Sequence, residues 1–224
     1  MQADNAADKA VLFDLDGTLV DTERENVESV VLAARRWHLE LDQDTRRFIV
    51  GHSWNEIHAR IKAQHESAPA MAELIAAAVA EKRGLFASKG YTPLPGADRL
   101  VRRLAKTVAL AVVSGSSTVE VRETIAGLGL TECFGVLLGA EAYQRGKPHP
   151  EPYQTAMRLL QVSPQRSIVI EDAEPGILAG KAAQARVIAV RQANFLGYDQ
   201  SAADVIVDTL DDVSDELLAR LWSR

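Results

Sequence analysis

Two aspartates follow an apolar run near the beginning of the sequence and are separated by a single residue. Val11-Leu12-Phe13 leads into Asp14 and Asp16, and Gly17 comes next. In an extended chain, side chains two residues apart share one face, so we expect the two carboxylates to lie close together. Close carboxylates repel each other and favour a cation, and ligands that are all oxygens suit Mg²⁺. The alternative is a strand that ends in a polar turn with two solvated acids.

A second acidic pair, Glu171 and Asp172, ends another apolar run, Ile168-Val169-Ile170. A lone pair of acids in this position usually caps the helix that follows it. Beside the first two aspartates, however, this pair completes a site for a divalent cation. The predicted metal ligands are therefore Asp14, Asp16, Glu171 and Asp172.

Two further segments have the residues of an anion site. Ser114 and Gly115 follow the apolar run 108–113 and precede a helix, so main-chain amides and the helix dipole would face one point. A serine-rich turn that only caps the helix is the alternative. Lys147 lies between Gly146 and Pro148, and these neighbours restrict its backbone. An exposed surface lysine would need no such restriction.

The elements that must position these residues alternate between strands and helices. Strands are predicted at 108–113, 136–138, 167–170, 187–190 and 205–207, with helices between them that include 151–160, 175–183 and 211–221. Ser117 and Glu120 are expected to form a capping box. Such alternation predicts a parallel sheet covered on both faces, with ligands at the carboxyl ends of the strands.

The segment between Val20 and about Tyr91 has only helical patterns. Capping boxes are predicted for Thr22 with Glu25 and for Ser53 with Glu56, and a long helix is predicted over 71–86. We therefore expect a catalytic core of residues 1–20 and 92–224, interrupted by a helical cap domain of residues 21–91.

Composition excludes several classes of protein. The chain has 224 residues, 47% of them hydrophobic and 25% charged, which is ordinary for a globular protein. A net charge of -6 argues against a nucleic-acid surface. Cys133 is the only cysteine, so neither an internal disulfide nor a cysteine-rich metal site is expected. With a polar start and no apolar run long enough for a membrane span, a soluble cytoplasmic protein is expected.

In this order, the segments around Asp14, Ser114, Lys147 and Glu171-Asp172 resemble the four motifs of the haloacid dehalogenase superfamily of phosphohydrolases. Asp14-Leu15-Asp16-Gly17-Thr18 is similar to the first motif, and the resemblance is strongest over 9–22 and 145–183. It implies an α/β fold, a doubly wound parallel sheet with an inserted all-helical cap. The position of the insertion resembles that of phosphoglycolate phosphatases, sugar-phosphate phosphatases and β-phosphoglucomutases.

The resemblance also implies a mechanism. Asp14 would be the nucleophile that becomes an aspartyl phosphate, and Asp16 would be the general acid and base. Mg²⁺ would be held by Asp14, Asp172 and the main-chain oxygen of Asp16, with help from Glu171. The phosphoryl oxygens would be bound by Ser114, Lys147 and the amides around Leu15, Asp16 and Gly115. The expected partner is a small phosphorylated metabolite, a sugar, polyol or glycolate phosphate, with no nucleic acid or membrane involved.

Two other functions are compatible with parts of the sequence. β-Phosphoglucomutases resemble this chain, but they have a histidine where Asn26 stands and an arginine where Trp54 follows Gly51-His52-Ser53. Hydrolysis is therefore the prediction, and mutase activity is the alternative. A binding or regulatory module on an inactive scaffold would lack one of the motif residues, and none is missing.

Substrate selection is predicted to lie in the cap. The loop 50–55 combines a glycine, polar groups and an indole, so the predicted substrate-binding residues are Asn26, His52, Trp54 and Asn55. Trp54 could instead serve only to pack the cap. The sequence leaves the identity of the substrate and the oligomeric state open.

Overall fold

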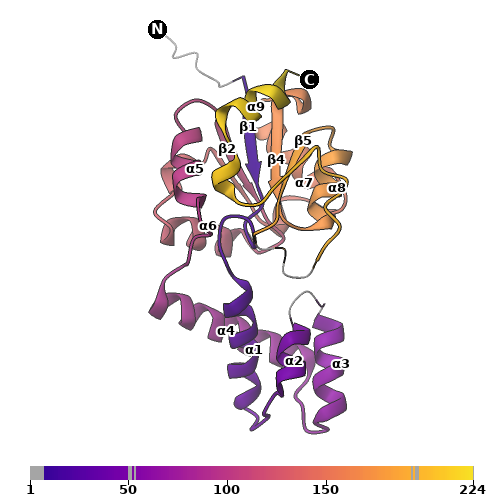
Figure 1. The fold of residues 1–224 in the computed structure, drawn as a ribbon. Helices are drawn as coiled ribbons and strands as arrows, with labels where there is room; N and C mark the ends of the chain where they lie inside the picture. The colour runs from indigo at the N-terminus through magenta and orange to yellow at the C-terminus, as the bar shows by residue number, and fades with distance from the viewer. Residues whose placement is uncertain (1–7, 50–51, 53, 193, 195–196, 224) are drawn as a thin grey trace. The chain divides into compact units, whose positions relative to one another are not determined.

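A computed structural model describes residues 8–49, 52, 54–192, 194 and 197–223 of the chain. Contacts within the chain divide it into two compact units (Figure 1). The first unit consists of Met1–Asp21 and Thr92–Arg224, and the second of Thr22–Tyr91.

The first unit contains a six-stranded sheet in which all neighbouring strands are parallel. Its strands are β1 (Ala10–Phe13), β2 (Ala109–Val113), β3 (Val136–Leu138), β4 (Ser167–Glu171), β5 (Arg186–Val190) and β6 (Val205–Val207). Their order, β3-β2-β1-β4-β5-β6, is that of a doubly wound sheet. The predicted fold class is confirmed, and the direction of winding reverses between β1 and β4, where such sheets bind ligands.

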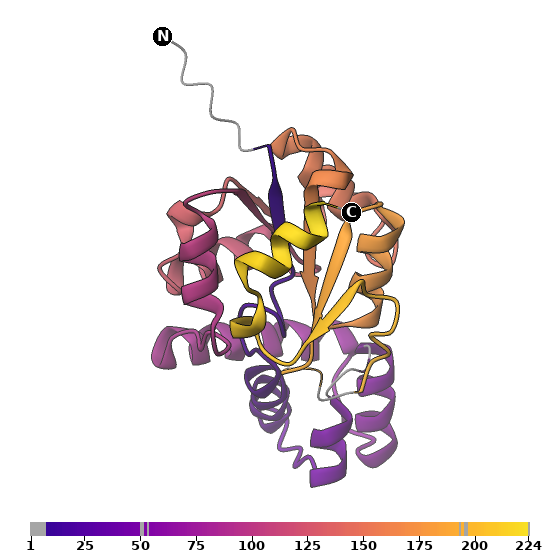
Figure 2. The same cartoon turned by 45° about the horizontal axis from the view of Figure 1, so that its top comes forward.

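Helices cover both faces of this sheet. They are α5 (Ala97–Leu104), α6 (Thr118–Gly127), α7 (Glu151–Leu160), α8 (Glu174–Ala182) and α9 (Asp215–Trp222), with 3₁₀ turns at Thr131–Cys133, Ala140–Ala142, Pro164–Arg166 and Leu210–Asp212. One face of the sheet packs on α7 and α8 through a core that includes Leu12, Val169 and Tyr153. The helix α9 crosses the strands on the other face (Figure 2).

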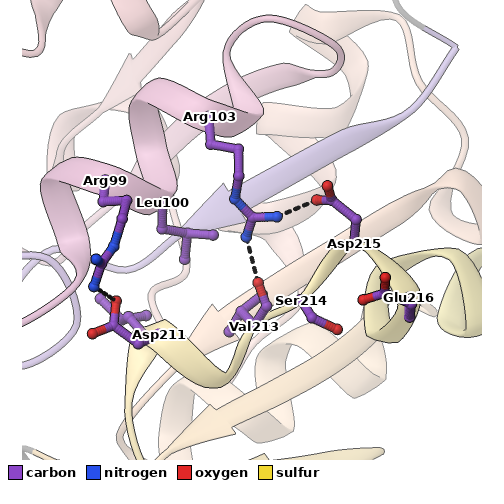
Figure 3. Close-up of a pocket in the computed structure, with 9 residues that line it drawn as sticks. Arg99, Leu100, Arg103, Asp211, Val213, Ser214, Asp215 and Glu216 are labelled. Carbon is purple, nitrogen blue, oxygen red and sulfur yellow. Dashed lines mark hydrogen bonds and ion pairs between the residues drawn. The ribbon is translucent and has the colours of Figure 1, made fainter.

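The last predicted helix, 211–221, is wrong in one respect: the structure breaks it at Val213 into a 3₁₀ turn and α9. Ser214 caps α9 by accepting a hydrogen bond from the main-chain N–H of Leu217. Arg103 of α5 donates to the carbonyl of Val213 and pairs with Asp215 (Figure 3). These contacts, which join residues about a hundred positions apart, fix the break.

The same region has an open surface hollow of about 490 Å³. Its lining includes Arg99 and Arg103, and Arg99 pairs with Asp211 at 2.5 Å (Figure 3). Both guanidinium groups pair with aspartates of the same wall, so the charge of each is balanced within the hollow's own lining. We therefore assign it a structural role in attaching α9.

The regular elements described in the second unit are all helices. Its helices are α1 (Glu23–Arg35), α2 (Gln43–Ile49), α3 (Trp54–Gln64) and α4 (Met71–Lys89). They bury an apolar core that includes Val30, Ile61 and Leu74. In the described part of the chain, no helix combines the length and the apolar character that a membrane span needs.

Details of the second unit differ from the sequence predictions. The helix α2 was not predicted; its main-chain N–H at Thr45 bonds to the carboxylate of Asp42, a capping signal in a short segment. Thr22 precedes α1 with helical φ and ψ and makes no side-chain cap bond, so the predicted box with Glu25 is wrong. The predicted box of Ser53 with Glu56 lies partly outside the described residues.

Candidate active site

Three parallel strands bring their carboxyl ends to one edge of the sheet. Phe13 at the end of β1 is in register with Val112 of β2 and Ile170 of β4. The main-chain N–H of Asp14 donates to the carbonyl of Ile170 at 3.0 Å, which extends this register by one residue. Asp14, Ser114 and Glu171 therefore lie at the same edge, as their positions in the sequence predicted.

Lys147 connects these strand ends through its ammonium group. Its Nζ donates to Asp14 Oδ1 at 2.5 Å, to Glu171 Oε1 at 2.6 Å and to the carbonyl of Val113 at 3.0 Å. An ammonium has three N–H donors, so all of them are used. The side chain is only 13% exposed, and its charge is balanced by the two carboxylates that it contacts.

The carboxylate of Glu171 is buried and held by several donors. Besides Lys147, Oε1 accepts a hydrogen bond from the hydroxyl of Tyr153 at 2.7 Å. Oε2 accepts from the main-chain N–H groups of Asp172 and Ala173 at 3.2 and 3.3 Å. The carboxylate also fills the space beside Gly176, where an added Cβ would come within 1.6 Å of Oε1. Its orientation is therefore fixed by the protein itself.

The carboxylate of Asp172 is positioned by the turn after β1. Thr18 donates its hydroxyl to Asp172 Oδ1 at 3.0 Å. Gly17 has a φ of +83°, and a Cβ there would lie 2.4 Å from Asp172 Oδ2. A larger residue at Gly17 would be strained and would displace the acid, so glycine is required at this turn for both reasons.

Asp14, Glu171 and Asp172 form a buried group in which one oxygen from each lies within 4.8 Å of the others. Among the described residues, this is the group of acidic, histidine and cysteine side chains that could hold a metal ion. All of its donors are carboxylate oxygens, the ligands that hard divalent cations prefer. The site therefore fits a metal ion by its chemistry.

Burial and neighbouring charge shift the protonation of this group. Burial, with help from the Glu171 carboxylate, raises the pKa of Asp172 to about 7. Burial also raises the pKa of Asp14, although the ammonium of Lys147 opposes the shift. For Lys147, burial favours the neutral amine, but Asp14 and Glu171 outweigh it and raise the pKa well above its ordinary value. A bound cation would oppose the uptake of protons by the acids.

The raised pKa of Asp172 predicts how stability depends on pH without metal. Between the ordinary pKa of 3.8 and about 7 the folded protein holds a proton that the unfolded chain releases. Stability from this group is therefore highest at low pH and is lost as pH rises towards 7. From pH 5 to 8 in EDTA, the wild-type melting temperature should fall relative to that of Asp172→Asn. Parallel pH profiles for the two proteins would contradict this prediction.

Asp14 and Asp16 have different hydrogen-bond partners in the structure. The strand β1 ends at Phe13 and the chain turns at Gly17, but the two carboxylates lie close enough that the charge of Asp16 adds to the rise that burial causes in the pKa of Asp14. The carboxylate of Asp16 accepts hydrogen bonds from Ser116 at 3.0 Å and Ser114 at 3.3 Å. Among the described residues, the carboxylate of Asp16 is not one of the three that form the candidate metal group.

The remaining residues predicted to bind phosphate also lie at the strand ends. In the described part of the structure, neither Leu15 nor Gly115 donates its main-chain N–H to another group. Gly115 is exposed, and a Cβ there would meet nothing within 4 Å. Open space and two available N–H donors at the edge of the sheet are suited to an anion.

The predicted substrate-binding residues belong to the second unit. Asn26 is half-buried on α1, and Asn55 is exposed at the start of α3. The ring of His52 stacks on Phe48 with a centroid distance of 3.7 Å. Trp54 is half-buried and packs against the core of this unit, as the alternative interpretation of the indole expected.

Sequence reasoning missed Tyr153, Thr18, Ser116 and Gln200. Gln200 lies between β5 and β6 and is 6% exposed; its side-chain Nε2 donates to the carbonyls of Asp172 at 2.6 Å and Val190 at 2.9 Å. It thereby connects the end of β5 to Asp172, the candidate metal ligand that follows β4. A glutamine in a loop without a motif gives no signal of this kind in the sequence.

Replacing Gln200 should therefore weaken metal binding. In Gln200→Leu the carbonyls of Asp172 and Val190 lose their donor, which should cost about 1–3 kcal/mol of stability. We expect the Mg²⁺ concentration for half-maximal phosphate release to rise by about 10-fold, as when an outer partner of a ligand is removed. Gln192→Leu is the control, because Gln192 donates to Pro95 instead. Equal Mg²⁺ dependence in the wild type and Gln200→Leu would disprove this assignment.

The strand order defines an α/β protein with three buried carboxylates and the ammonium of Lys147 at the ends of its central strands. A family model described as haloacid dehalogenase-like hydrolase matches residues 11–190, and the chain belongs to this family. The resemblance seen in the four motifs is thereby confirmed.

Known proteins similar to this chain include phosphatases. The chain is 32% identical over 207 residues to the bifunctional riboflavin kinase/FMN phosphatase of Arabidopsis thaliana, and the match covers 91% of this chain and 54% of that protein. The chain thus spans about half the length of the Arabidopsis protein. It is 38% identical over 190 residues to hexitol phosphatase A of Escherichia coli (strain K12), covering 81% of this chain and 82% of the relative.

A solved structure also resembles most of the chain. CbbY from Rhodobacter sphaeroides in complex with phosphate is 25% identical and has a TM-score of 0.78, covering 92% of this chain and 96% of that one. Family and relatives together make this protein an enzyme that acts as a phosphatase on phosphoesters.

Proposed function

We propose that the protein hydrolyses a small phosphomonoester in an Mg²⁺-dependent reaction through an aspartyl phosphate on Asp14. The observation that carries this proposal is the contact of Asp14 Oδ1 with Lys147 Nζ at 2.5 Å, beside the buried acids Glu171 and Asp172. A carboxylate in this position has a cation beside it that neutralises the charge of an arriving phosphoryl group.

In the first step Asp14 attacks phosphorus, and the bond from phosphorus to the leaving oxygen breaks. Asp16 gives its proton to that oxygen, so the product leaves as an alcohol. In the second step water attacks the same phosphorus, and Asp16 takes a proton from it. The bond between phosphorus and Asp14 then breaks, which releases inorganic phosphate and regenerates both aspartates.

The chain's own groups would hold the phosphoryl oxygens during both steps. We assign this role to the hydroxyl of Ser114, the ammonium of Lys147 and the main-chain N–H groups of Leu15, Asp16 and Gly115. One N–H of Lys147, which now bonds to the carbonyl of Val113 or to a carboxylate, would instead donate to a phosphoryl oxygen. Preorganised donors of this kind supply most of the catalysis in phosphoryl transfer.

Mg²⁺ would be held by the carboxylates of Asp14 and Asp172 and by the main-chain oxygen of Asp16. Glu171 contributes its charge, since its oxygens already accept bonds from Lys147 and Tyr153 and from two main-chain N–H groups. When bound, the ion would supply further neutralisation of the charge on the phosphoryl group.

The substrate is proposed to be a sugar or polyol phosphate, with glycolate phosphate as the smallest member of the set. The similarity to hexitol phosphatase A supports this choice. Recognition of the organic part is assigned to the helical unit, as a cap domain with Asn26, His52, Trp54 and Asn55. Because Trp54 also packs on the core of that unit, its replacement would change stability as well as specificity.

Phosphate release from a panel of small phosphomonoesters, with Mg²⁺ and with EDTA, tests the proposal. The panel includes hexitol phosphates, phosphoglycolate and β-glucose 1-phosphate, and the 6-phosphate isomer of the last is followed separately. We expect Mg²⁺-dependent release from at least one sugar or polyol ester. Isomer formation without net release of phosphate would instead mean a mutase, in which Asn26 and Trp54 replace the histidine and the arginine without loss of that activity.

A further inference from the structure

The carboxylate of Asp16 accepts hydrogen bonds from two hydroxyl groups of the loop after β2. Its Oδ2 accepts from Ser116 Oγ at 3.0 Å and from Ser114 Oγ at 3.3 Å. Ser114 Oγ in turn accepts the main-chain N–H of Ser116 at 3.0 Å. The shorter of the two bonds to Asp16 therefore comes from a residue outside the four motifs.

Ser116 is held in place from several sides. Its carbonyl accepts the main-chain N–H of Ala140 at 2.8 Å. The hydroxyl of Tyr143 donates to the carbonyl of Ser114 at 2.7 Å, which fixes the loop two residues earlier. Ser117, the next residue, forms the predicted capping box with Glu120 at the start of α6. A side chain on such a fixed backbone can orient its partner.

The two serines cannot play the same part once substrate is bound. A serine hydroxyl has a single proton to donate. If Ser114 donates to a phosphoryl oxygen, as the proposed function requires, it no longer donates to Asp16. Ser116 then remains as the hydroxyl donor of this loop that holds the Asp16 carboxylate.

We propose that Ser116 is a positioning residue that orients the Asp16 carboxylate for proton transfer to the leaving oxygen. The proposal rests on the proposed function, because it assigns the proton donor to Asp16. In the step concerned, the bond from phosphorus to the leaving oxygen breaks while the Asp16 proton moves to that oxygen. Without Ser116, the carboxylate loses the shorter of its two serine hydroxyl bonds and is less firmly oriented on this path, so the alcohol must leave with less assistance.

The effect of Ser116 should therefore depend on the leaving group. An alkoxide is a poor leaving group and needs a proton, whereas p-nitrophenolate is a stable anion and leaves without one. General acid catalysis is worth about 10²–10⁴-fold in rate. If the acid loses its orientation, the rate of release from alkyl esters should fall by part of that factor. The rate for the nitrophenyl ester should change little.

The test is a single-turnover comparison of the wild type with Ser116→Ala and Ser116→Thr, with enzyme in excess. The two esters are p-nitrophenyl phosphate and the alkyl phosphate that the wild type hydrolyses fastest. For Ser116→Ala we expect release of the alcohol to slow by about 10–100-fold, and release of nitrophenolate to change by less than about threefold. Ser116→Thr keeps the hydroxyl and should restore alcohol release. Thr118→Ala is the control, since that hydroxyl bonds to Glu141.

Equal slowing of both esters would overturn the proposal, because Ser116 would then act on the fold or on the substrate. In a parallel steady-state assay, a higher KM with unchanged kcat would overturn it for the same reason. Failure of Ser116→Thr to restore alcohol release would overturn it as well. Failure of the proposed function would be visible in the wild type alone, as no phosphate release from any ester or no phosphorylated Asp14.

Discussion

Asp14→Asn protein is expected to release phosphate at least about 10⁴-fold more slowly than the wild type, as when a nucleophile is removed from a catalytic group. The amide is neutral and does not form the acyl phosphate that the proposed reaction needs. The fold should survive, because the change removes one of three buried carboxylates that repel one another. Phosphate release and the melting temperature in EDTA measure the two effects.

Asp21→Asn is the control for this change, because it alters an aspartate of the same segment that lies outside the acid group. Mass spectrometry of the purified Asp14→Asn protein must show that the introduced amide has not hydrolysed back to the carboxylate. Activity within about 100-fold of the wild type in such protein would remove Asp14 from the nucleophilic role.

Lys147→Met is expected to damage both activity and stability. The variant leaves Asp14 and Glu171 buried without the cation that now contacts both. Breaking a buried pair in this way typically costs about 3–5 kcal/mol. Since Lys147 now opposes the rise in the pKa of Asp14, its removal should raise that pKa further. The loss of stability should therefore be smaller at pH 5 than at pH 8, because the folded variant takes up protons.

Turnover of Lys147→Met should fall by about 10³-fold or more, since a donor to the phosphoryl group is lost. Urea unfolding at the two pH values and phosphate release at saturating Mg²⁺ measure these effects. Lys181→Met is the comparison, because Lys181 pairs with Asp204 in a more exposed position and should matter by about 1 kcal/mol or less. A Lys147→Met protein as stable and active as Lys181→Met would contradict the assigned contacts.

The positions of the candidate catalytic residues at strand ends could be predicted because parallel strands end at one edge of a sheet. An apolar run followed by Asp14, Ser114 or Glu171 locates the end of a strand within a residue or two. The parallel register of β1, β2 and β4 then brings these ends together. Lys147 could be predicted from its restricted backbone. For these residues, local sequence and topology agree.

Other parts of the site depend on contacts between distant segments. Tyr153 bonds to Glu171, 18 positions away, and Gln200 bonds to the carbonyls of Asp172 and Val190, 28 and 10 positions away; neither residue lies in a recognisable pattern. The break before α9 likewise depends on Arg103, about a hundred residues earlier. The serine partners of Asp16 lie about a hundred residues away along the chain, so the segment around Asp16 gives no sign of them.

The contact of Glu171 with Gly176 has a consequence for redesign of this enzyme. The carboxylate occupies the volume in which any side chain at position 176 would begin. Residues 171 and 176 therefore cannot be varied independently. In a library that varies residue 176 alone, nearly every substitution would displace the Glu171 carboxylate, whatever its effect on specificity. Shortening residue 171 at the same time would make room at position 176 but would remove one of the three acceptors that hold Lys147. New substrates are better sought by varying the helical unit, whose residues are independent of this packing.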